Sequence, residues 1–316
     1  MKNRFAVFAA LCGLFALLRA SPDAIAASRC GLRLCGELIV PSLFPFFVLS
    51  GLLARLGLPA ALGRLLARPA ARLLHVSGAG ATALLLGLTG GYPMGAAYVA
   101  QLIREGTVSK AEGERLLLFC NNSGPAFLVG AIGVGVFGSV SIGLRLYAVH
   151  ALAAVLTGLL LRGKRSPSPS SVSEVAALPF SEALTEAVRQ AASSMLNVCG
   201  FVVCFAVFTG LLEANGFYAA LQPLLGRVLP LEEATLRALL CGFFELGSGV
   251  GALRGLAPTT LHLALAAALA GWGGVSVLFQ SLAVLGDTDI KSAPLLAGRL
   301  CSAGFSFLLA WIVFRT

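Results

Sequence analysis

Long apolar stretches recur along this chain from one end to the other, and only short polar segments separate them. A helix that crosses a bilayer needs roughly 20 apolar residues, and a chain built mostly of such stretches cannot bury them in a soluble fold. The composition agrees, since 58% of the 316 residues are hydrophobic and only 12% are charged. We therefore expect an all-α polytopic membrane protein that lies in the cell membrane and has the lipid bilayer as its first partner.

A polar, Ser- and Pro-rich segment divides the chain, and we expect residues 163–188 to form a linker and a lead-in to the next helix. In front of it we predict an N-terminal membrane helix at residues 1–28 and a first repeat at residues 29–162. Behind it we predict a second repeat at residues 189–316. Both show a span, an interfacial stretch, two segments interrupted by Gly or Pro, and a final span. Broken or re-entrant helices at matching positions of two halves indicate a transporter-like core.

Basic residues give the chain a formal net charge of +9, but they are scattered between the apolar segments. No soluble segment is long enough to present a basic face, so we expect no nucleic-acid partner. Arg64, Arg68 and Arg72 are spaced four apart, which predicts one face of an interfacial helix that meets anionic headgroups. If this cluster and the basic linker are both cytoplasmic, one broken segment of the first repeat re-enters rather than crosses. The two repeats are then inverted.

Two breaks in the first repeat carry polar groups at membrane depth. They read Gly-Gly-Tyr-Pro-Met at 90–94 and Cys-Asn-Asn-Ser-Gly-Pro at 120–125. Broken helices leave unpaired N–H and C=O groups that can hold an anion or a cation. A Pro kink used for packing, or a cap on the following half-helix, is the alternative. A cap needs one polar side chain, whereas the second break has three, so this break favours solute contact over capping. Across both breaks we expect the solute to contact Tyr92, Pro93, Asn121, Asn122, Ser123 and Gly124.

The second repeat places Glu245 near the middle of the apolar segment 242–251. An ionisable residue at that depth indicates a functional site, because its exposure to lipid costs several kcal/mol. A structural carboxyl, protonated or paired with an Arg, is the alternative. We expect Glu245 to lie at the solute site together with Ser248 and to couple a proton or a cation.

The last break, at 270–277, contributes Trp272 as a flat apolar wall and Ser276 as a hydroxyl. A Trp serves equally well in packing or at the interface. Shortly after this break, Asp287, Asp289 and Lys291 are expected to end one helix and cap the next.

At these breaks the sequence resembles the sporulation integral membrane protein family typified by YlbJ, also called SpoVV. The motifs GYPxGA, EGERLL, NNSGP, GxFE and TDIK occur here at 91–96, 112–117, 121–125, 242–245 and 288–291. The resemblance implies the nucleoside-recognition or Gate-domain grouping, which includes spore maturation proteins and the membrane part of ferrous-iron transporters. It further implies a role in sporulation, with dipicolinate as cargo and the forespore membrane as location.

We predict a transporter for a small organic anion of the dipicolinate kind, with the broken helices of both repeats forming one site at mid-membrane. No enzyme is expected, because the chain has no HExxH motif and its three His are far apart in sequence. We accordingly assign no catalytic residue, metal or cofactor. The alternatives are a non-transporting membrane scaffold in spore or envelope assembly, and a nucleoside or cation transporter of the Gate type. The oligomeric state stays open.

Overall fold

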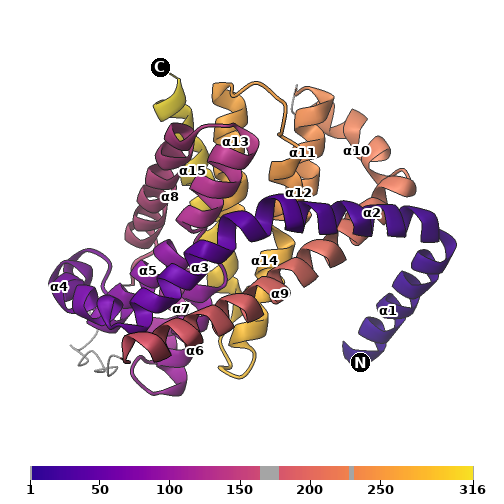
Figure 1. The fold of residues 1–316 in the computed structure, drawn as a ribbon. Coiled ribbons are helices and arrows are strands. Elements are labelled where there is room, and N and C mark those ends of the chain that lie inside the picture. The colour runs from indigo at the N-terminus through magenta and orange to yellow at the C-terminus, as the bar shows by residue number, and fades with distance from the viewer. Residues whose placement is uncertain (1, 164–177, 228–230, 316) are drawn as a thin grey trace.

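The computed structural model of the protein describes residues 2–163, 178–227 and 231–315. All regular structure in these residues is helical, and two segments, η1 and η2, are π-helical (Figure 1). In chain order the elements are α1 (Lys2–Arg19), α2 (Ser21–Leu34), η1 (Cys35–Ile39), α3 (Val40–Arg55), α4 (Leu58–Leu73), α5 (Gly78–Gly90), α6 (Met94–Arg104), α7 (Lys110–Leu116), η2 (Ala126–Val136), α8 (Val140–Leu160), α9 (Phe180–Ala214), α10 (Phe217–Gly226), α11 (Glu233–Phe244), α12 (Leu246–Gly251), α13 (Thr260–Trp272), α14 (Gly274–Leu285) and α15 (Ser292–Phe314).

Five helical runs in the described residues are long and apolar enough to cross a bilayer, or six if the bent pair α4–α5 counts as one span. They are Ser21–Arg55, Val140–Leu160, Phe180–Ala214, Thr260–Leu285 and Ser292–Phe314. The expectation of an all-α, multi-pass membrane protein is therefore confirmed. The predicted linker lies mostly outside the described residues, which end at 163 and resume at 178.

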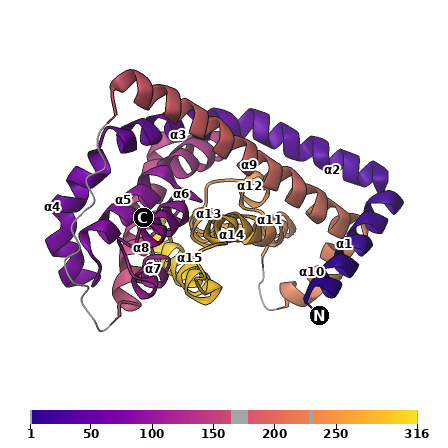
Figure 2. The ribbon, with the colours of Figure 1, turned by 90° about the horizontal axis from the view of Figure 1, so that it is seen from below.

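Two runs of 35 residues, α2 through α3 and α9, pack antiparallel along one side of the molecule (Figure 2). Small residues set their spacing, since a Cβ added to Gly31 would lie 3.0 Å from Ala206 Cβ and one on Gly51 would lie 3.5 Å from Ala187 Cβ. The boundaries drawn after residues 28 and 188 fall inside these runs, because no Gly or Pro interrupts the chain there. The predicted lead-in is thus the first part of α9.

Several helix ends meet at one end of the molecule, which we call the basic end. His75 Nδ1 donates to Gly163 O over 2.5 Å and joins the start of α5 to the end of α8. Ser77 N donates to Glu112 Oε1 over 2.7 Å and joins α5 to α7. Arg162 donates to the last turn of α4. The arginines of α4 and the basic residue that precedes the linker therefore lie on the same side. The segments at this end are 73–77, 104–115, 160–163 and 286–291.

Two hairpins enter from opposite ends and turn back. The α5–α6 hairpin leaves the basic end, turns at residues 91–93 and returns to it at Arg104. The α11–α12 hairpin belongs to the other end, where Thr235 Oγ1 lies 3.0 Å from His262 Nε2 and Thr260 Oγ1 donates to Phe314 O over 2.8 Å. The other two broken pairs, α7–η2 and α13–α14, continue through their breaks from one end to the other.

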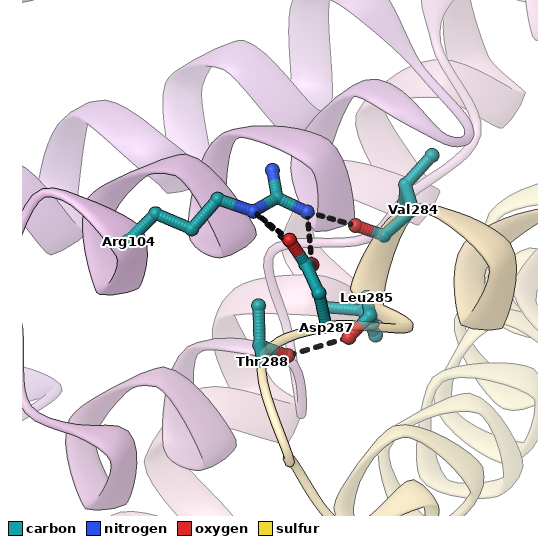
Figure 3. Close-up of polar contacts among 5 residues, drawn as sticks. All are labelled: Arg104, Val284, Leu285, Asp287 and Thr288. Carbon is teal, nitrogen blue, oxygen red and sulfur yellow. Dashed lines mark hydrogen bonds and ion pairs between the residues drawn. The ribbon is translucent and has the colours of Figure 1, made fainter.

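Ion pairs hold the loop between α14 and α15 onto α6 and α7. The Nε of Arg104 lies 3.1 and 2.9 Å from the two carboxylate oxygens of Asp287, and its Nη2 also donates to Val284 O over 3.0 Å (Figure 3). Lys110 Nζ lies 2.6 Å from Asp289 Oδ2. The start of α7 and the end of α6 are thereby tied to one loop of the second half.

The expected capping role of this loop is corrected. Lys291 occupies the N-cap position of α15, but no side chain there makes a cap hydrogen bond. The carboxylates of Asp287 and Asp289 face the cations of α6 and α7 instead, and Lys291 N donates to Glu114 Oε1 over 3.2 Å.

Candidate functional site

The four breaks of the chain meet around one small cavity of about 50 Å³, which we call the shared cavity. The first break supplies residues 90–92, the second 123–124 and the third 245–247, while α14, which follows the fourth break, supplies Val277 and Gln280. The rest of the wall is apolar and comes mainly from η1, α3, η2 and α9. Both halves of the chain therefore enclose the same small space, and Tyr92 and Glu245 face it together.

Close backbone contacts shape the first two breaks. A Cβ added to Gly87 or to Gly95 would lie only 1.7 or 1.9 Å from Cys120 O. Gly91 has φ +76°, and a Cβ on it would lie 2.8 Å from the backbone N of Gly124. Only glycine permits this backbone conformation and this approach together. The α5–α6 hairpin is thus locked directly against the main chain of the second break.

The two asparagines of the second break have partners in the protein and do not line the cavity. Asn121 Nδ2 donates to Ser281 Oγ over 2.8 Å, whereas Asn121 Oδ1 is buried without a partner. Asn122 Nδ2 donates to Phe119 O over 2.7 Å. Neither caps the following half-helix, which has Pro125 at its N-cap position and no side-chain cap.

Ser123 and Tyr92 reach from the first half to the carbonyls that end α13. Ser123 Oγ donates to Ala270 O over 3.0 Å, and Tyr92 Oη lies 3.2 and 3.3 Å from the carbonyl oxygens of Ala270 and Gly271. Ser123 N in turn donates to His150 Nε2 over 3.0 Å. The polar groups of the first half therefore satisfy carbonyls exposed by the fourth break.

Glu245 is buried, with 2% of its surface exposed, and stands at the N-terminus of α12. Its carboxylate accepts the N–H of Gly247 over 2.8 Å and the N–H of Ser248. A carboxylate at this position is stabilised by free backbone donors and by the helix dipole. No cation of the described residues lies within ion-pair distance of it, so the alternative of a carboxyl paired with Arg is not what the fold shows.

A second buried charge, Arg299 on α15, was not among the predicted site residues. Its Nη1 donates to Trp272 O over 3.1 Å, and its Nη2 donates to Val277 O over 3.3 Å and to Ser281 Oγ over 3.0 Å. Its guanidinium carbon lies 4.9 Å from the centre of the Tyr92 ring. Among the described residues it has no carboxylate partner. The signal was available, because Arg299 is the one charged residue of segment 292–314.

Gln280 is the other residue that the sequence analysis missed. It is buried, it lines the shared cavity, and its amide makes no hydrogen bond with the described residues. A single amide within the apolar segment 274–285 was the available signal. Gln280 thus presents to the cavity a polar group that no described residue satisfies.

Four of the predicted residues lie beside the cavity rather than on it. Trp272 is not a free wall, because its ring stacks on Phe243 with centroids 5.4 Å apart and its Nε1 donates to Phe243 O over 2.9 Å. Ser276 Oγ is buried without a partner. Ser248 and Pro93 line two neighbouring cavities.

These neighbouring cavities differ greatly in size. The one at Ser248 has about 810 Å³ and lies between α2, the end of α9, α11 and α12. The one at Pro93 has about 20 Å³. Glu245 lines the shared cavity and Ser248 lines the large one, and the hydrogen bond from Ser248 N–H to the Glu245 carboxylate joins the two cavity walls. The α11–α12 side of the site is therefore much more open than the α5–α6 side.

Comparison with known proteins gives one curated relative. The "Sporulation integral membrane protein YlbJ" of Bacillus subtilis (strain 168) is 31% identical over 314 residues, which cover 92% of this chain and 77% of the relative. No family model matches the chain, and no solved structure matches it.

Proposed function

Because this chain belongs to the YlbJ family of sporulation integral membrane proteins, we propose that it carries a small organic anion across the membrane through the cavity where its four breaks meet. The observation that carries this proposal is the convergence of breaks from both halves around the buried Glu245. The resemblance further suggests dipicolinate as the cargo and the forespore membrane as the place.

The order of elements supports an inverted repeat. A 35-residue run, a helix that begins after a left-handed glycine (Gly57 or Gly216), two broken pairs and a full span follow one another in each half. In the first half the broken pair that turns back starts at the basic end, and in the second half it starts at the opposite end. Midplane sites between such halves are typical of secondary transporters. The arginines of α4 and Arg162 lie at the basic end, and by the positive-inside rule they favour a cytoplasmic location for it.

The size of the cavity implies a closed form of the carrier. A site for a small organic ligand usually measures roughly 300–1,000 Å³, far more than the about 50 Å³ found here. A solute must therefore separate the hairpins before it can enter. The large cavity beside Ser248 favours the α11–α12 side as the one that opens.

The free polar groups around the breaks suit an anion that arrives with a proton. The Gln280 amide and the Ser276 hydroxyl can donate hydrogen bonds that no described residue uses. Four half-helices, α6, η2, α12 and α14, begin at the breaks and point their N-terminal N–H groups toward them. Glu245 already occupies one of these N-termini. A protonated Glu245 would remove its repulsion toward the anion and let a proton gradient drive uptake.

The test is uptake of labelled dipicolinate into proteoliposomes under an imposed pH gradient. We expect Glu245→Gln to abolish gradient-dependent uptake, because the amide keeps the size of the side chain but cannot titrate. Insertion and folding should be retained, since one amide oxygen can still accept an N–H of α12. Glu37→Gln is the matched control: Glu37 lies in another spanning run, but its side chain is 60% exposed.

Three outcomes distinguish proton coupling at Glu245, a structural role for Glu245 and a non-transporting scaffold. Loss of gradient-dependent uptake in Glu245→Gln alone supports proton coupling at this carboxyl. Undiminished uptake in that variant makes Glu245 structural. No uptake by the wild-type protein, together with normal insertion, favours the scaffold alternative over transport.

A further inference from the structure

The side of the molecule formed by α3, α4 and α5 combines an apolar groove with a row of arginines. The groove has about 280 Å³ and is lined by Phe46, Leu49, Ser50, Leu53, Ala54, Leu58, Leu62, Leu85, Leu86, Thr89 and Pro125. Several of these side chains are well exposed, with Leu49 at 59% and Leu53 at 46%. This site is separate from the shared cavity, with which it has no lining residue in common.

Helix α4 bends sharply away from α5, as a helix on the membrane surface does where it meets a helix that enters the bilayer. Its part Ala61–Leu73 makes an angle of 103° with α5, which runs from the basic end toward the breaks. One face of α4 packs on α5, where Gly63 and Ala70 are buried. Leu58 and Leu65 are exposed on a second face, at 41% and 74%. The helix therefore directs apolar side chains toward the bilayer along its length.

The charge of α4 lies in a stripe that borders these leucines, since residues seven apart, such as Leu65 and Arg72, share one side of a helix. Arg64, Arg68 and Arg72 are exposed and recur every four residues. Residues 38–104 contain no Asp or Glu. Arg68 and Arg72 form no ion pair or hydrogen bond with the described residues, so their charge is available to an anion from outside the chain. The same helix lines the groove with Leu58 and Leu62, and this combination of arginines and apolar groove matches a phosphate with an acyl chain attached.

We propose that this surface binds one anionic phospholipid, with an acyl chain in the groove and the headgroup phosphate at Arg68 and Arg72. The inner end of the groove is formed by Thr89 and Pro125. Thr89 lies two residues before Gly91, and Pro125 follows Gly124, and these two glycines are the ones in direct backbone contact. The bound chain therefore touches the back of the first two breaks and holds the α5–α6 hairpin in its closed position.

The proposal is tested by native mass spectrometry of the full chain titrated with phosphatidylglycerol and with phosphatidylcholine that has the same acyl chains. We expect preferential binding of phosphatidylglycerol. Replacing Arg68 and Arg72 by Gln should weaken that binding by on the order of five-fold for each arginine, and leave phosphatidylcholine binding unchanged. Arg254→Gln is the matched control, because Arg254 is an exposed arginine at the opposite end without an ion pair among the described residues.

A second variant tests the groove. Leu49→Trp fills it from its exposed side and should weaken binding of both phospholipids, while thermal unfolding stays that of the wild type. Glycerol phosphate, which has the headgroup charge but no acyl chain, should not compete. Equal binding of the two lipids, an unchanged preference in the double Gln variant, or full competition by glycerol phosphate would each overturn the proposal.

Discussion

The two halves of this protein close their breaks with different chemistry. In the first half the contacts are uncharged: Gly87 and Gly95 press on Cys120 O, and Ser123 uses its hydroxyl and its N–H. In the second half, Glu245 takes the N-terminus of α12 and Arg299 takes carbonyls around the fourth break. Tight backbone packing holds the breaks of the first half, which we call the neutral half. Charged side chains hold the breaks of the second half, the charged half, and protonation or a bound anion can change their contacts. We therefore expect the charged half to respond to solute.

The most damaging test of this comparison is Arg299→Gln. The substitution leaves buried carbonyls near the fourth break without a charged donor, and hydrogen bonds to charged groups contribute about 1.5–3 kcal/mol each. We expect a loss of about 4 kcal/mol of stability, measured as chemical or thermal unfolding in a fixed detergent. Arg254→Gln, an exposed arginine on the same half, should change nothing. A loss below about 1 kcal/mol for Arg299→Gln would show that the charged half does not depend on this charge.

The neutral half is probed by Gly87→Ala. The new Cβ would lie 1.7 Å from Cys120 O, so the backbone of one of the two breaks must move. We expect a loss of about 2 kcal/mol, the usual cost of an overpacked site. Gly200→Ala on α9 is the control, because a Cβ there meets nothing within 4 Å. Equal stability of the two glycine variants would show that close backbone packing does not hold the breaks of the first half.

The smallest effect concerns the loop at the basic end that links the two halves. The hydrogen bonds from Arg104 hold the pKa of the Asp287 carboxyl below its ordinary value of 3.8. A carboxyl with a lowered pKa stabilises the fold above that ordinary value, and this contribution disappears as the pH falls through the lowered pKa. Asp287→Asn should therefore lower the Tm slightly at pH 7, with the difference shrinking in acid. A difference that is independent of pH would rule out the ion pair as its cause.

Much of the architecture could be predicted from the sequence, because apolar length and helix-breaking residues are local properties. The spans at α8 and α15 and the four breaks lie where the apolar stretches and the Gly/Pro interruptions place them. The convergence of the breaks followed from the matching order of the two halves.

Individual contacts were less predictable, since they depend on which side chains meet across the fold. Trp272 turned out to be covered by Phe243, and Asn122 is held by Phe119 O. Arg299 and Gln280 had a usable signal, a lone polar residue in an apolar helix, but were overlooked. Their partners come from other elements, and no local pattern identifies them.

The two 35-residue runs have a consequence for the membrane itself. At 1.5 Å per residue each is about 52 Å long, whereas the hydrocarbon core is roughly 30 Å thick and the whole bilayer roughly 45 Å. To stay within it they must lean by about 30° to 55° from the normal. Hydrophobic mismatch acts on that angle, so a thinner bilayer makes the helices lean further. The shared cavity is lined by Leu43 and Phe47 from one run and by Val198 and Val202 from the other. A change in bilayer thickness therefore acts on the cavity wall through the tilt of these two runs.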